Sequence, residues 1–135
     1  MINSAEEFVA LRDSEIKAEY DRSAMEEAPV AVWHDVIERF PDHRQWVAHN
    51  KTVPVEVLEV LCDFDADTRW FVACKRKLSY ELFERLSKDA DTNVRIAISV
   101  NKKTPLGILE KLFQDVDEEV AHASRDNYDA RRNTE

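Results

Sequence analysis

Large apolar residues recur along this chain at intervals of about 25 residues when it is aligned on Ser4, Pro29, Pro54, Ser79 and Pro105. The fourth and the seventh residue after each of these positions are large and apolar. Residues three apart lie on one face of an α-helix, so the pattern predicts five helices with one buried face each. The ten residues are Phe8 and Leu11, Trp33 and Val36, Leu58 and Leu61, Phe83 and Leu86, and Leu109 and Leu112.

A second apolar pattern follows the first after a short acidic turn. Its members stand at positions i, i+3 and i+4, which again share one helical face. They are His43, Trp46 and Val47, then Thr68, Phe71 and Val72, then Val94, Ala97 and Ile98, and finally Val120, Ala123 and Ser124. Each unit is therefore predicted to be a helix of about ten residues, a turn, and a shorter helix of about seven.

The predicted fold class is all-α, and residues 1–135 are predicted to be a single repeat domain. A helical hairpin of this size cannot bury its own apolar face, so neighbouring units are expected to stack into an α-solenoid. The five units are 4–28, which caps the N-terminal end, then 29–53, 54–78, 79–104 and 105–130, with residues 128–135 as a polar C-terminal tail.

Residues at the unit boundaries suit the ends of helices. Pro29, Pro54 and Pro105 are expected to open helices, where a missing N–H costs nothing. Ser4 with Glu7 forms a capping box, and Thr104 is a candidate N-cap. Asn50, Asn101 and Asn127 recur at the end of the second helix, where we expect a left-handed backbone that asparagine tolerates well.

The tetrapeptide DADT occurs at residues 65–68 and again at residues 89–92. The arginines that follow these copies, Arg69 and Arg95, are separated by two residues more than the copies themselves. The segment 63–69 looks like the start of a calcium loop. However, Thr68 occupies the place of the turn glycine, and Cys74 that of the bidentate glutamate. We therefore interpret the turn aspartates as N-caps of the second helix, whose positive end they complement.

The segment DADTNVRIAISVNKKTPLGILEKL (89–112) resembles the leucine-rich-repeat-variant family and, more loosely, HEAT-like repeats. The shared pattern is D-x-x-V-R-x-x-V/A-A-x-N-x-x-T-P-x-x-x-L-x-x-L, with a good match over residues 42–127 and a degenerate one over 4–28. The resemblance implies a right-handed superhelix of alternating longer and shorter helices. Iron–sulfur modules accompany some of these repeats, but this chain lacks the cysteine cluster that they need.

Composition narrows the class of protein further. A single glycine disfavours an all-β fold, and the net charge of −9 opposes binding to polyanions by the molecule as a whole. We see neither a secretory signal nor an apolar run long enough to cross a membrane, so a cytoplasmic protein without membrane association is expected.

No constellation for catalysis, metal binding or a cofactor is evident. His34 and Glu38 are one helical turn apart without a third ligand, and no phosphate loop or nucleophile elbow is present. Cys62 and Cys74 are too far apart for a C-x-x-C motif and are expected to be buried, reduced thiols. The sequence therefore predicts a protein that is not an enzyme, with no metal site and no cofactor.

One face of the predicted second helix is a candidate binding surface. In the two central units it carries apolar pairs at i and i+4, Trp70 with Cys74 and Ile96 with Val100, whereas the outer units carry polar residues there. An apolar centre with a polar rim is typical of an interaction patch. The alternative is that this row packs beneath the first helix of the neighbouring unit.

The loops between units form a second candidate surface because they are basic in three successive units. Stacking would align their six cations as a ridge for an acidic partner, and the alternative is a solvated edge without a ligand. The six residues are Lys51, Lys75, Arg76, Lys77, Lys102 and Lys103.

These features together predict a monomeric, non-catalytic protein–protein interaction module, a small adaptor or inhibitor. Its partner is expected to be another protein, bound through the central second-helix face and the basic edge. One alternative is nucleic-acid binding along the basic ridge, which the net charge disfavours. Another is an immunity or antitoxin role, in which acidic faces mimic nucleic acid toward a basic toxin.

Overall fold

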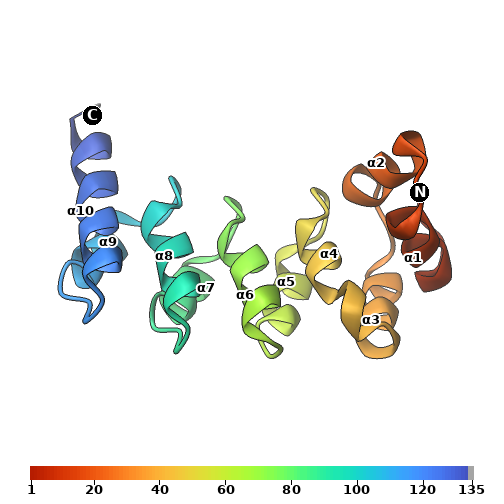
Figure 1. The fold of residues 1–135 in the computed structure, drawn as a ribbon, viewed down its shortest axis with the longest axis horizontal. Coiled ribbons are helices and arrows are strands. Elements are labelled where there is room, and N and C mark those ends of the chain that lie inside the picture. Colours follow the sequence, from red (N-terminus) through yellow and green to blue (C-terminus); the bar gives the residue numbers. More distant parts are fainter. Residues whose placement is uncertain (134–135) are drawn as a thin grey trace. The chain divides into compact units, whose positions relative to one another are not determined.

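The computed structural model describes residues 1–133, and the regular structure in that range comprises ten α-helices and one short 3₁₀ helix, with no strand (Figure 1). The chain divides into two compact units, Met1–Val72 and the part that starts at Ala73. An all-α fold, as the apolar patterns predict, is therefore observed.

The N-terminal unit contains five α-helices, the 3₁₀ helix and most of a sixth α-helix. These are α1 (Ala5–Asp13), α2 (Lys17–Met25), α3 (Val30–Arg39), η1 (Pro41–His43), α4 (Arg44–His49), α5 (Val55–Leu61) and α6 (Ala66–Ala73), which ends at the boundary. Helix α1 packs on both α2 and α3, and α3 also contacts α4 and α5. At the centre, the fully buried rings of Phe8 and Trp33 meet edge to face with their centroids 5.1 Å apart.

The C-terminal unit contains α7 (Tyr80–Ser87), α8 (Thr92–Val100), α9 (Leu106–Leu112) and α10 (Glu118–Arg132). Helix α7 packs on α8 and α9, and α10 packs on α8 and α9. All ten residues of the first apolar pattern are buried across the two units, with exposed fractions of 5% or less. The hydrophobic pattern therefore locates the core correctly.

The helix lengths differ from the expected alternation of a longer and a shorter helix. The second helix of each of the last two pairs is the longer one, with nine residues in α8 against eight in α7, and 15 in α10 against seven in α9. The segment predicted as a polar tail also continues α10 as far as Arg132, and residues 134–135 lie outside the described part. The Tyr128 ring packs against Phe113 with centroids 5.3 Å apart, which gives this last helix an apolar contact to extend over.

A turn aspartate caps the second helix in three of the units, as predicted, whereas α2 and α4 have no side-chain cap. Asp91 Oδ1 accepts the Asn93 and Val94 N–H groups at the start of α8, and Asp117 does the same for α10. Asp65 accepts the Thr68 N–H and hydroxyl in α6. These three aspartates are equivalent and recur at the same spacing as the arginines Arg69 and Arg95, which confirms that the two DADT copies are out of register.

At the first helices the capping predictions hold only in part. Ser4 Oγ accepts the Glu7 N–H, and Glu7 bonds back to the Asn3 N–H. Proline occupies the N-cap position of α3, α5 and α9. Thr104 is not an N-cap, because its buried hydroxyl donates instead to the Ile98 carbonyl at 2.7 Å.

The predicted left-handed conformation of the three asparagines is wrong. Asn50 and Asn101 have φ angles of −59° and −66°, Asn127 lies inside α10, and no residue between 1 and 133 has a positive φ. Each side chain instead reaches back 24 to 28 residues along the chain and donates its Nδ2 group to two backbone carbonyls, an arrangement that we call an asparagine clamp. The acceptors are Ser23 and Glu26 for Asn50, Ala73 and Lys75 for Asn101, and Ser99 and Asn101 for Asn127.

Replacing Asn50 with alanine is expected to lower the free energy of unfolding by about 2–3 kcal/mol. Asn50 is fully buried, and besides its two carbonyl acceptors its Oδ1 accepts the Thr52 N–H and hydroxyl, each at 2.7 Å. The substitution removes the amide partner of the Ser23 carbonyl and of the Thr52 N–H, and urea denaturation measures the loss. Asn93→Ala is the control, because Asn93 is exposed and its side chain makes no hydrogen bond within residues 1–133. Equal losses for both variants would contradict a structural role for the clamp.

Candidate functional site

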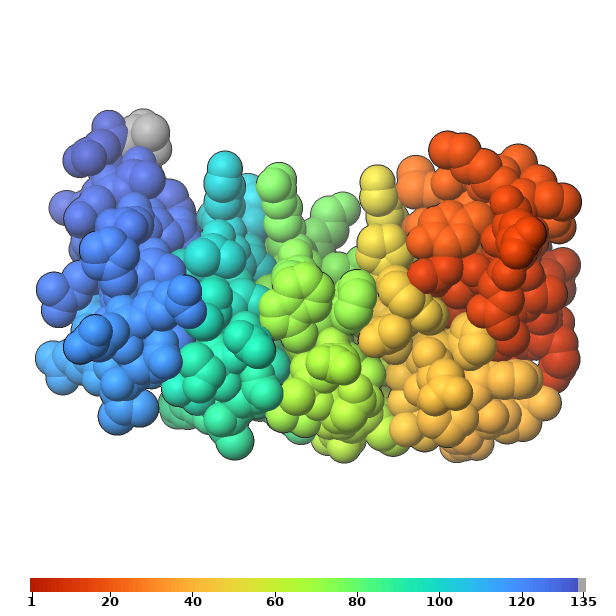
Figure 2. Space-filling view, viewed as in Figure 1, coloured from red at the N-terminus to blue at the C-terminus, as the bar shows by residue number. Residues whose placement is uncertain are grey.

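The loop before α7, drawn in green, and the loop after α8, drawn in teal, lie at the same edge of the C-terminal unit (Figures 1 and 2). They border a groove of about 220 Å³ at the end of α8. The residues that line this loop groove are Cys74, Arg76, Ala97, Val100, Asn101 and Lys102. Four of them, Cys74, Arg76, Val100 and Lys102, are binding residues predicted from the sequence.

The Asn101 clamp builds the groove. Its Nδ2 group donates to the Ala73 carbonyl at 2.9 Å and to the Lys75 carbonyl at 2.7 Å, which ties the first loop to the end of α8. Its Oδ1 accepts the Lys103 N–H at 2.9 Å, which shapes the second loop. One side chain therefore fixes both loops. The recurrence of this asparagine is visible in the sequence, but the sequence pattern assigns it a backbone role that it does not have.

The rim of the loop groove is positively charged. Residues 74–79 and 101–105 carry five lysines and arginines and no acid. Arg76, Lys77, Lys102 and Lys103 are exposed, and their side chains make no ion pair or hydrogen bond within the described part of the chain. Their charges lie within a Debye length of one another along each loop, so they add to a local positive field despite the acidic chain as a whole.

The floor of the groove is apolar. Val100 is 54% exposed at the end of α8, and Ala97, one turn earlier, is buried beneath it. Cys74 is exposed and reduced, so the expectation of two buried thiols is wrong for Cys74 and right for Cys62. The sulfur of Cys74 is nevertheless partly desolvated, and this burial raises the pKa of the thiol above its usual range.

The remaining predicted residues do not line this groove. Ile96, also on α8, is half-buried, and so is Lys75. In the N-terminal unit, Lys51 is exposed and its N–H bonds to the Ala24 carbonyl at 2.8 Å. Trp70 is 40% exposed, and its ring stands edge to face with Phe71 at 5.1 Å.

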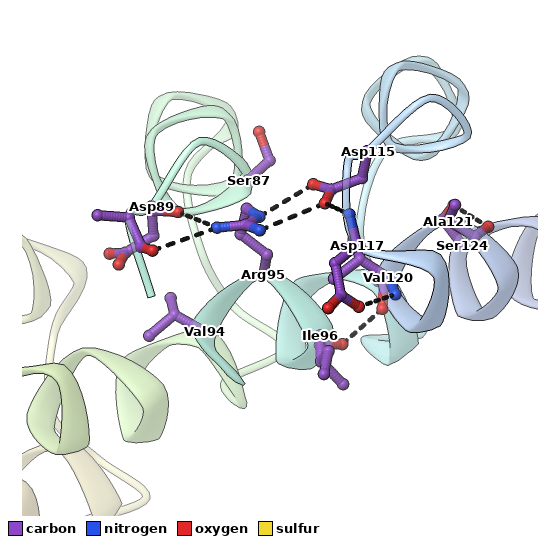
Figure 3. Close-up of polar contacts among 12 residues, drawn as sticks. Ser87, Asp89, Val94, Arg95, Ile96, Asp115, Asp117, Val120, Ala121 and Ser124 are labelled. Atoms are coloured by element: carbon purple, nitrogen blue, oxygen red, sulfur yellow. Dashed lines mark hydrogen bonds and ion pairs between the residues drawn. The ribbon is translucent and has the colours of Figure 1, made fainter. Parts of the chain in front are cut away.

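The acidic turns lie at the opposite edge of the C-terminal unit, and their polar groups are occupied by structural bonds (Figures 1 and 3). Arg95 Nε donates to Asp115 Oδ2 at 2.9 Å, and Arg95 also donates to the Asp89 carbonyl at 2.7 Å. Asp115 Oδ1 accepts the Asp117 N–H. Arg95 is thus a structural residue that ties two turns together. The sequence shows that an arginine recurs at this position but does not show the bonds it makes.

The N-terminal unit carries a polar groove of about 430 Å³ beside its own acidic turn, lined by Pro41, Asp42, Arg44, Gln45, Asp65, Asp67 and Thr68. Burial opposes ionisation of Asp65, but hydrogen bonds from Thr68 and the charge of Arg44 lower its pKa overall. Arg44 itself donates Nε to the Ile37 carbonyl at 2.7 Å. The Asp65 carboxylate in this groove is occupied by the cap of α6.

Residues 1–133 contain no group of three or more His, Cys, Asp or Glu side chains placed to hold a metal ion. Within the same residues, no helix combines the length and the apolar character that a bilayer crossing requires. No protein-family model matches the chain, and no curated protein or solved structure matches it either.

Proposed function

We propose that this protein is a non-catalytic protein-interaction module, a small adaptor or inhibitor, and that it binds its partner through the loop groove. The observation that carries this proposal is the meeting of unpaired cations and exposed apolar groups around Val100, on loops that a buried asparagine holds in place. Surfaces that combine an apolar centre with a charged rim are typical of protein interfaces.

The scaffold is, in this proposal, a right-handed α-solenoid of about five repeats related to the leucine-rich-repeat-variant or HEAT-like architecture. Two observations support this architecture. Aspartates cap helices at a constant spacing, and the asparagine clamps reach back by about the length of one repeat. Proteins of such architecture present edges and faces to partners and share a scaffold rather than an activity.

Affinity capture from the source lysate, followed by binding measurements with the purified partner, tests this function. We expect Val100→Asp to weaken binding at least about tenfold. An aspartate here places a charge in the apolar centre of the interface, and a loss of about 1.4 kcal/mol of binding free energy is a factor of ten in the dissociation constant. Ile96→Asp is a poor comparison because Ile96 is half-buried, so Lys88→Glu, on an exposed side chain outside the groove, is the control. If no protein binds the wild type specifically, the proposal fails.

The same experiment shows whether the partner binds at Trp70 in the N-terminal unit or at the loop groove. Trp70 is exposed, and tryptophan is enriched among residues that dominate binding energies. A partner that is lost with Trp70→Asp and kept with Val100→Asp would retain the interaction function and move it away from the loop groove.

A further inference from the structure

We infer that the loop groove binds an acidic peptide segment in which an aliphatic side chain is flanked by carboxylates. This inference rests on the proposed interaction function and names the chemistry of the partner. The groove joins an apolar floor, formed by Ala97 and Val100, to two exposed cations, Arg76 and Lys102, on its lining.

The size of the groove favours a side chain over a small molecule. Its volume of about 220 Å³ lies below the range of roughly 300–1,000 Å³ that is usual for small-molecule pockets. An aliphatic side chain laid against Val100 would remove apolar surface from water on both partners, at about 25 cal/mol per Å². The floor therefore selects an apolar residue of a partner.

The charges of the rim select the neighbours of that residue. Three arginines elsewhere in the chain are paired with carboxylates: Arg22 with Glu26, Arg39 with Glu6 and Asp35, and Arg95 with Asp115. Others bond to backbone carbonyls or lie over rings, as Arg44 does with Ile37 and Phe64. Arg76 has no such partner within residues 1–133, and neither has Lys102. A carboxylate from outside the chain would complete the pairing, and a guanidinium can hold it with two parallel hydrogen bonds.

The groove fits a peptide better than a nucleic acid. Proteins that bind single strands combine cations with aromatic side chains on which bases stack, and no aromatic residue lines this groove. The net charge of −9 also repels a long polyanion, whereas a short acidic segment meets mainly the local field of the two loops.

Cys74 provides a direct report of occupancy because it lines the groove, whereas the other cysteine, Cys62, is only 3% exposed. Alkylation by iodoacetamide at alkaline pH, read by intact mass, follows Cys74 in the native protein. The probe is the acetylated and amidated peptide Glu-Glu-Leu-Glu-Glu. At ten times its dissociation constant, we expect it to slow alkylation roughly tenfold, because only the free fraction reacts.

Matched peptides and variants define the outcome. Glu-Glu-Ser-Glu-Glu and Lys-Lys-Leu-Lys-Lys should protect far less, and Arg76→Glu with Lys102→Glu should abolish protection, whereas Lys88→Glu should retain it. Circular dichroism shows whether each variant is folded, and a free cysteine peptide in the same solution corrects for direct effects on the reagent. Dependence of protection on both the leucine and the two cations supports the inference.

Absence of protection by the acidic peptide at millimolar concentration would overturn the inference. Stronger protection by a thymidine decamer than by the peptide would overturn it in favour of nucleic acid. Either result leaves the proposed interaction function standing if a captured partner still binds the wild type specifically, so the two failures are distinguishable. Peptide protection without a captured partner would retain the ligand chemistry and leave the adaptor role unsupported.

Discussion

Replacing Trp33 with alanine is expected to lower the free energy of unfolding by about 3–5 kcal/mol. The Trp33 side chain, on α3, is fully buried, and its ring meets that of Phe8, on α1, edge to face. Truncation removes this contact and leaves a cavity that the surrounding helices can fill only in part. Urea denaturation followed by circular dichroism measures the change.

Trp70→Ala is the matched control for this prediction. Trp70 is the same residue type but is 40% exposed, so its truncation is expected to cost about 1 kcal/mol or less. The pair of variants therefore separates a tryptophan of the core from one that is available for binding. Equal destabilisation by the two substitutions would contradict the assignment of Trp33 to the core.

Replacing Arg95 with methionine is also expected to cost about 3–5 kcal/mol, the usual loss when one partner of a buried ion pair is removed. The side chains of Arg95 and Asp115 are only 12% and 9% exposed. Methionine keeps much of the arginine stem but leaves the Asp115 carboxylate without its cation, and the Asp89 carbonyl loses a donor as well. Thermal and urea unfolding measure the effect.

The surface pair of Lys88 and Glu84 is the control for charge removal. Its atoms are 3.5 Å apart, and the two side chains are 65% and 38% exposed. Exposed pairs one helical turn apart contribute at most about 0.5 kcal/mol, so Lys88→Met should have little effect. If Lys88→Met destabilised the protein as much as Arg95→Met, burial of the Arg95 pair would not be the cause.

The core and the helix caps were predictable because they depend on local sequence. Residues at i and i+3, such as Phe8 and Leu11, share a face in any α-helix, and an aspartate at the start of a helix meets N–H groups only two or three residues away. Thr104 shows where local sequence is not sufficient. Its hydroxyl could accept an N–H of the next helix as an N-cap, but the path of the chain brings it to the Ile98 carbonyl, to which it donates.

The candidate site was predictable only in pieces. Exposure or charge singles out Cys74, Arg76, Val100 and Lys102, but their meeting in one groove depends on the approach of two loops that are one repeat apart in the sequence. The interaction that brings the loops together, made by Asn101, is a side-chain bond to distant carbonyls. No local propensity encodes it, although the recurrence of asparagine in the sequence was its visible signal.

The asparagine clamps also bear on how the chain folds. Each one joins residues separated by only 24 to 28 positions in the sequence. Closing a loop of this length costs less chain entropy than closing a longer one, and proteins whose contacts are close in sequence fold quickly. A segment that carries a clamp can therefore be secured to the stretch of chain before it soon after it leaves the ribosome, before the rest of the chain has been made.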